Sequence, residues 1–115
     1  ISFIYSSTAF AGEKVYYCID DETIGFKRTP ETTYTSQKFE PERFKLQINF
    51  ENQTVKMGNF VLYYRGAAFY SDNIGHSISM PATDALKDRE RFTYTRSGIF
   101  GDITIYLSVG NCEIF

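Results

Sequence analysis

Residues 44–57 read FKLQINFENQTVKM, and this stretch decides the fold class. In its first seven residues, apolar side chains alternate strictly with polar ones, so a strand built from them has one apolar face and one polar face. The next four residues, ENQT, are polar, and the alternation resumes at Val55 and Met57. The pattern therefore predicts a β-hairpin in the middle of the chain, with its apolar side facing a core.

Short apolar stretches rich in aromatic and β-branched residues recur at roughly ten-residue spacing through the rest of the chain, as in all-β domains. We expect residues 60–64 to be buried on both faces, because their apolar run is continuous. Helical composition occurs only in residues 82–91, where Thr83 or Asp84 is placed to cap one turn. Predicted breaks between strands are residues 20–22, Gly58-Asn59, residues 97–101 and Gly110-Asn111.

These patterns predict an all-β fold: a single antiparallel sheet domain of about 7–9 short strands, forming a small barrel or sandwich with at most one short helical turn. The composition agrees, because 11 Phe and 9 Tyr with no Trp suit the half-buried surface of a sheet. A chain of 115 residues has room for one such domain.

Charge and hydropathy argue against a nucleic-acid partner and against a membrane-spanning helix. The net charge is −2, and acidic and basic residues are interleaved, so we predict no nucleic-acid partner, which would need a basic face. No apolar run approaches the ~18 residues that a membrane-spanning helix needs, so we predict no membrane span in the mature chain.

Residues 1–11, ISFIYSSTAFA, carry no charge and end with Ala9 and Ala11 at the two positions where signal peptidase accepts small residues. We interpret them as a signal-peptide remnant and residues 12–115 as the single all-β domain of a secreted or periplasmic protein. A plain N-terminal strand is the alternative interpretation.

The two cysteines are Cys18, in the first predicted strand of the domain, and Cys112, near the end of the chain. In a small exported domain such a pair indicates a disulfide. Two free core thiols are the alternative. With one histidine and no C-x-x-C motif there are too few soft ligands for zinc, so we predict no metal site and no cofactor.

His76 is the only histidine and precedes Ser77, but no nucleophile-elbow motif surrounds either residue. We expect a solvated loop histidine and no catalytic residue. Residues 20–22, Asp-Asp-Glu, lack the ligand spacing of a calcium loop and are expected to form a solvated turn. An unrecognised hydrolase would require acidic or Ser/His groups that converge in one cleft.

Tyrosines on several predicted strands are the strongest binding signal. Exposed tyrosines give rigid, amphipathic contact area, which suits proteins, sugars or lipids. We select Tyr17, Tyr63, Tyr94 and Tyr106 as a candidate binding surface. The alternative is that cross-strand aromatic pairs merely stabilise the sheet.

Five segments form a recognisable frame with the signal-like tail: residues 16–18 (YYC), 25–26 (GF), 44–46 (FKL), 92–94 (FTY) and 112–115 (CEIF). In this frame the chain resembles short, exported, single-disulfide bacterial proteins of unknown function. The resemblance implies an exported all-β domain and no activity. The nearest architecture with a known role is the lipocalin-like barrel, but the Trp of the lipocalin G-x-W signature is absent.

The sequence thus supports two hypotheses. The first is a non-enzymatic, exported β-domain that acts as a binding or interaction module for an unknown protein. The alternative is a small lipocalin-like barrel that binds a small apolar ligand, which an interior void above ~300 Å³ would favour. The side chains that would line such a void are Phe44, Leu46, Ile48, Phe50, Ile105 and Leu107.

Overall fold

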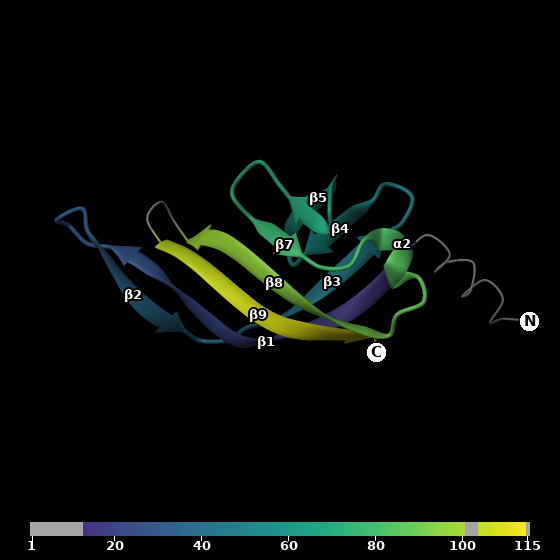
Figure 1. Cartoon of the computed structure of the whole chain (residues 1–115), viewed down its shortest axis with the longest axis horizontal. Helices are drawn as coiled ribbons and strands as arrows, with labels where there is room; N and C mark the ends of the chain where they lie inside the picture. The colour runs from purple at the N-terminus through teal and green to yellow at the C-terminus, as the bar shows by residue number, and fades with distance from the viewer. Residues whose placement is uncertain (1–12, 101–103, 115) are drawn as a thin grey trace, which may run out of the picture.

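The structure is a computed structural model that describes residues 13–100 and 104–114. At residue 100 it describes the backbone but not the side chain. The interpretation of residues 1–11 as a signal remnant or strand lies outside the described residues. The elements, shown in Figure 1, are β1 (Glu13–Arg28), β2 (Tyr34–Phe39), β3 (Arg43–Asn49), β4 (Thr54–Met57), β5 (Phe60–Gly66), β6 (Phe69–Ser71), β7 (Ser77–Ser79), α2 (Thr83–Leu86), β8 (Arg91–Phe100) and β9 (Thr104–Ile114).

All nine strands belong to one antiparallel sheet in the order β2-β1-β3-β4-β5-β6-β7-β8-β9. An additional pairing between β1 and β9 closes strands β1 and β3–β9 into an eight-stranded barrel. The all-β prediction is confirmed, and the sheet is a barrel rather than a sandwich. In the described part of the chain, no helix has the length and apolar character needed to cross a membrane.

β1 is long enough to serve two parts of the molecule. Residues 13–19 pair with β3, whereas residues 23–28 pair with β2, and β9 follows β1 through both halves. The predicted acidic turn at residues 20–22 is wrong: the strand continues, and a β-bulge between Asp20 and Glu22 takes up the extra residue. The distal half of β1 therefore extends beyond the barrel.

This extension is a four-stranded sheet, which we call the arm. It consists of β2, residues 23–28 of β1, residues 104–109 of β9 and residues 95–100 of β8, of which residues 95–97 also pair with β7 in the barrel. Figure 1 shows the arm projecting from the barrel on the side opposite α2.

Two glycines that appeared to mark turns lie inside strands instead. β8 continues to Phe100 and β9 runs through Gly110, so the predicted breaks at residues 97–100 and 110–111 are wrong. Gly98 lies opposite Tyr106, and a Cβ there would be 2.6 Å from the tyrosine ring. Gly110 lies opposite Tyr94, with the same distance to its hydroxyl. Both glycines leave room for a tyrosine ring across the strand.

The barrel interior is filled by alternate side chains of its strands. The central hairpin is confirmed, with Leu46, Ile48, Val55 and Met57 all buried. Residues 60–64 are not buried on both faces as predicted, because only Leu62 points fully inward. The buried cluster comprises Tyr16, Cys18, Leu46, Ile48, Val55, Met57, Leu62, Tyr70, Ile78, Met80, Leu86, Phe92, Tyr94 and Cys112.

α2 closes one end of the barrel. Its single turn inserts Leu86, which is fully buried, and Lys14 Nζ donates hydrogen bonds to the carbonyl oxygens of Leu86 (2.9 Å) and Arg89 (2.8 Å). The Tyr16 hydroxyl also donates to the Arg89 carbonyl, at 2.6 Å, and burial raises the pKa of Tyr16 to about 12. The N-cap is Ala82, without a side-chain cap, so tertiary contacts hold this turn in place of the predicted cap.

The predicted disulfide is present between Cys18 and Cys112, with an S–S distance of 2.00 Å. The two residues are direct partners in the β1–β9 register. The bond therefore crosses the seam at which the first and last strands close the barrel.

Candidate functional site

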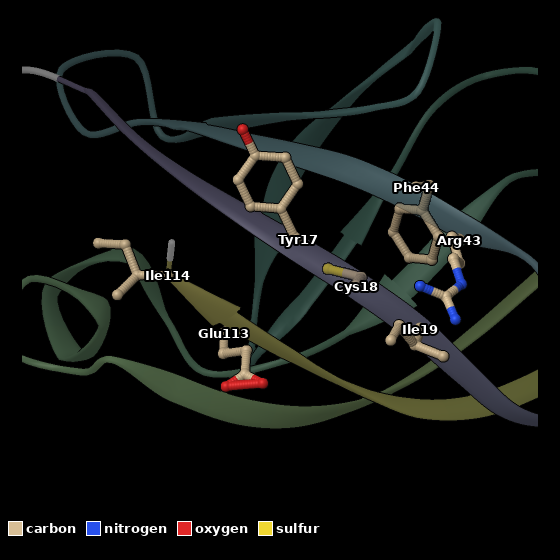
Figure 2. A pocket seen from close by; sticks show the side chains of 7 residues that line it. All are labelled: Tyr17, Cys18, Ile19, Arg43, Phe44, Glu113 and Ile114. Carbon is tan, nitrogen blue, oxygen red and sulfur yellow. The ribbon is translucent and has the colours of Figure 1, made fainter.

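A groove on the outside of the barrel, along β1, forms a pocket with a volume of about 580 Å³. Alternation explains its position: Tyr16 and Cys18 point into the core, so Tyr17 and Ile19 point outward. Figure 2 shows the residues that line the groove, which come from three neighbouring strands: Tyr17, Cys18, Ile19, Arg43, Phe44, Glu113 and Ile114.

The groove combines apolar side chains with one charge on each side. Arg43 of β3 lies opposite Ile19, and Glu113 of β9 lies opposite Tyr17. Because β3 and β9 flank residues 16–19 of β1, the cation and the anion lie on opposite sides of the apolar residues. This arrangement suits an extended chain that presents apolar side chains to β1 and opposite charges to the two neighbouring strands.

The four tyrosines selected from the sequence do not form one surface. Tyr17 is exposed and lines the groove, whereas Tyr63 is exposed on β5, where the Arg65 guanidinium lies 5.7 Å from its ring centroid. Tyr94 and Tyr106 are each only 4% exposed, so their assignment to an exposed surface is wrong. Both belong to a buried polar network.

This network centres on an ion pair between Asp20 and Arg96. Arg96 Nη2 donates to Asp20 Oδ2 at 2.6 Å, and Arg96 Nε donates to Asp20 Oδ1 at 3.1 Å. The Tyr94 hydroxyl donates to Asp20 Oδ1 at 2.5 Å. Arg96 also donates to Glu42 Oε1 (3.0 Å) and to the Tyr106 hydroxyl (3.2 Å). No buried side-chain nitrogen or oxygen among the described residues lacks a partner, as a buried ion pair requires.

The pKa shifts follow from these contacts. Burial alone would raise the pKa of Asp20, but hydrogen bonds from Arg96, Tyr94 and the Glu42 backbone outweigh it and lower the pKa. Burial alone would lower the pKa of Arg96, but its hydrogen bonds to Asp20 and Glu42 raise it instead. Burial and the Asp20 carboxylate raise the pKa of Tyr94. The pair is therefore charged throughout the physiological pH range.

A second pocket, of about 360 Å³, adjoins this network. Its lining includes Arg96 and Tyr106 of the network, Phe60 and His76. The prediction that His76 is solvated is wrong, because its exposed fraction is 8%. Its ring stacks on Phe60 with 3.8 Å between ring centroids, and its Nδ1 lies 3.0 Å from Asp72 Oδ2.

The Asp72–His76 pair orders a loop. Asp72 Oδ1 also accepts hydrogen bonds from the backbone N–H groups of Ile74, Gly75 and His76, at 2.8–3.0 Å. Within the described residues, no hydroxyl or thiol forms a hydrogen bond with the other ring nitrogen of His76. The pair thus lacks the nucleophile that a catalytic histidine would activate.

The six residues predicted to line an interior ligand site do not lie together in the structure. Leu46 and Ile48 are packed in the core, and Phe44 and Phe50 are partly buried against it. Ile105 and Leu107, however, are exposed on the outer face of the arm. In the described part of the chain no group of three or more His, Cys, Asp or Glu side chains is placed to hold a metal ion.

The buried network was missed at the sequence level. One signal was available: Asp20 lies two residues after Cys18 and four after Tyr16, so strand alternation points its side chain inward with theirs. A comparison with protein-family models, curated proteins and solved structures found no match to this chain, so the geometry alone supports an assignment of function.

Proposed function

We propose that the protein is a non-enzymatic, exported binding module that holds an extended segment of a partner protein in the groove along β1. The observation that carries this proposal is the groove itself: about 580 Å³ on the outer surface, with apolar side chains of β1 between Arg43 and Glu113. An extended segment suits it because every second side chain of a strand points to the same face, so apolar residues can face β1 while charged residues at the ends of the segment reach Arg43 and Glu113.

Export is supported by the disulfide. Cys18 and Cys112 are the only cysteines, and they are bonded to each other. Structural disulfides persist in oxidising compartments and are rare where thiols are kept reduced. We expect protein isolated from its native cell under thiol-trapping conditions to contain no alkylatable cysteine. Two alkylated cysteines would contradict the proposed location.

The outer groove is favoured over the interior as the binding site. The 360 Å³ pocket exceeds the ~300 Å³ set for an interior ligand, but Glu42, Arg43 and Arg96 line it, which does not suit an apolar ligand. The side chains of Leu46, Ile48, Leu62 and Tyr70 have no exposed area and pack against one another inside the barrel. An apolar ligand in the interior would have to displace them, at a cost comparable with that of disrupting a core. A segment in the groove would contact outward side chains of β1 without displacing these core residues.

The proposal can be tested by NMR titration of the oxidised, ¹⁵N-labelled protein with a synthetic peptide in which valines are flanked by one glutamate and one lysine. We expect shift changes concentrated at Tyr17, Ile19, Arg43, Glu113 and Ile114. Ile19→Ser should weaken binding at least tenfold, about 1.4 kcal/mol. Val61→Ser is the matched control, because Val61 is similarly exposed (43%, against 42% for Ile19) but lies on β5.

Two outcomes would contradict the proposal. Equal weakening by Ile19→Ser and Val61→Ser would show that binding depends on general surface hydrophobicity. A titration with decanoate that shifts Leu46 and Ile48, while the peptide shifts nothing, would support the interior site of a lipocalin-like barrel.

A further inference from the structure

The outer face of the arm carries a second set of exposed apolar side chains, separate from the groove. On β1, Ile24 and Phe26 point outward, because they alternate with the buried Thr23 and Gly25. Register places Leu107 opposite Ile24 and Ile105 opposite Phe26. We call this surface the arm face. Its most exposed apolar members are Ile24 (44%), Phe26 (51%), Tyr34 (54%), Ile105 (48%), Leu107 (44%) and Val109 (44%), and Ile99 of β8, opposite Ile105, is 39% exposed.

The two faces of the arm have different environments. Side chains on the inner face, such as Tyr106 and Ser108, are buried. Tyr106 accepts a hydrogen bond from Arg96, and the hydroxyl groups of Ser108 and Thr23 share a hydrogen bond. Within the described part of the chain, the arm face is exposed, and its apolar residues lie beside Lys38 and Ser36 of β2 and Ser97 of β8. A sheet with apolar side chains on such a face is half of a two-layer structure.

The area of the arm face matches a dimer interface. The exposed fractions of its six most exposed apolar residues correspond to roughly 600 Å², at the upper end of the largest patch expected on a monomer. If all of this area were buried, two such faces packed together would bury about 1,200 Å², the lower limit for a specific, stable interface.

Charge gives the arm face a self-complementary pattern. Along β1, Glu22, Ile24, Phe26 and Arg28 share the outer face, so an anion and a cation flank the two apolar residues at opposite ends. Two stacked arms can be related by a two-fold axis that lies in the plane between them. The axis passes between Ile24 and Phe26, perpendicular to the strands, so the two copies of β1 run in opposite directions. It places Glu22 over Arg28 of the second copy, and the symmetry repeats this pair.

We propose that two copies of this chain associate through their arm faces, stacked sheet on sheet about a two-fold axis, as in a β-sandwich with a layer spacing of ~10 Å. The interface is isologous: apolar residues of β1 and β9 form its centre, and two Glu22–Arg28 pairs form its ends. This inference is independent of the proposed function, because the groove residues Tyr17 and Ile19 lie on the other side of the bulge in β1.

The test is sedimentation equilibrium of the oxidised protein from about 1 µM to about 1 mM, a range that covers weak and moderate dimers. We expect a reversible monomer–dimer equilibrium. Leu107→Ser should raise the dissociation constant at least tenfold, and Val61→Ser, at an almost equally exposed position on β5 (43%, against 44%), should leave it unchanged.

Exchanging the charges of Glu22 and Arg28 tests the proposed two-fold geometry without altering the apolar centre of the interface. Glu22→Arg and Arg28→Glu should each weaken the dimer, because each variant places like charges together at both ends of the interface. The double variant E22R/R28E should restore the affinity. Both residues are exposed, so folding is not at risk.

A protein that stays monomeric at about 1 mM would overturn the proposal. So would a dimer that is insensitive to Leu107→Ser, or charge variants whose effects simply add without restoration. The groove proposal survives each of these results, because its peptide titration is read at Ile19 and Arg43 in dilute, monomeric protein.

Discussion

Asp20 and Arg96 form the contact whose loss should destabilise the protein most among single ion pairs. Arg96→Met should lower the free energy of unfolding by about 3–5 kcal/mol, because the Asp20 carboxylate, with no exposed side-chain area, would lose its cation. Urea denaturation followed by circular dichroism measures this loss.

Arg91→Met on the same strand is the control. Arg91 Nη2 lies 4.0 Å from Glu113 Oε2, and both side chains are well exposed, so the change should cost less than about 1 kcal/mol. Similar losses for both variants would mean that burial of the Asp20–Arg96 pair does not determine its importance.

Asp72 should make stability depend on pH in acid. Burial alone would raise its pKa, but the N–H groups of residues 74–76 and the His76 ring outweigh burial and lower the pKa below its ordinary 3.8. The folded state therefore binds this proton less readily than the unfolded chain. The stabilisation by Asp72 is complete above about pH 5 and is lost as the pH falls through the ordinary value towards the lowered pKa.

Asp72→Asn should consequently be less stable than the native protein at pH 7, and the difference should shrink below about pH 4. Urea midpoints at pH 7, 5, 4 and 3 measure it. A difference that stays constant down to pH 3 would show that Asp72 acts only as a neutral hydrogen-bond acceptor.

At the scale of single residues, the sequence could show which face a side chain takes but not which partner it finds. Alternation places Asp20 inward with Tyr16 and Cys18. Its partner Arg96 is 76 residues away, and nothing local connects the two. The same limit applies to Tyr94 and Tyr106, whose burial depends on Asp20, Arg96 and the glycines opposite their rings.

The turn between β5 and β6 is an element whose sequence and conformation disagree. Ala67 and Ala68 form a two-residue hairpin loop with φ of 52° and 60°, the left-handed values that favour Asn and Gly. Replacing Ala67-Ala68 by Asn-Gly should therefore stabilise the protein, by about 1 kcal/mol in total. A rise in the urea midpoint without a change in slope would confirm the effect.

The reverse exchange provides the matched control. Gly58 has φ of 61°, and no atom lies within 4 Å of the position of an added Cβ, so Gly58→Ala introduces only backbone strain and should destabilise the protein. An Asn-Gly variant that is no more stable than the native protein would show that the turn adapts its backbone to alanine without cost.

Strands were predicted well where alternation was uninterrupted and poorly where glycine or acidic residues broke it. The hairpin of β3 and β4 was predicted correctly, because its polar break coincides with a real turn. Gly98 and Gly110 were interpreted as turn residues, although they lie under tyrosine rings within β8 and β9. Glycine permits both structures, and only the residue across the strand distinguishes them.

For the whole molecule, barrel closure was beyond the sequence pattern. Periodicity indicates that β1 is a strand, but not that it pairs with β3, β2 and β9. The cysteines came closest to showing it, because a bond between Cys18 and Cys112 requires the first and last strands to be neighbours. The groove and the arm face both depend on this long-range pairing, so neither could be located in advance.

Reduction of the disulfide should lower stability substantially. The bond joins residues separated by 94 positions, and the chain-entropy model assigns a loop of this length roughly 4–5 kcal/mol, as an upper value. Thermal unfolding with and without a reductant measures the loss, and Cys18→Ala/Cys112→Ala should match the reduced protein. An unchanged midpoint would mean that the denatured chain stays compact without the bond.

The position of Cys18 and Cys112 also has a mechanical consequence. Tension applied at residues 13 and 114 stretches only residues 13–17 and 113–114 before it reaches the sulfur–sulfur bond. Residues 19–111 lie inside the covalent loop, so the barrel and the arm are shielded from the load. In an optical trap the oxidised protein should therefore show no unfolding step from the loop, whereas reduction should release its full contour length. A module anchored at both ends would thus keep its shape under pulling forces as long as its surroundings remain oxidising.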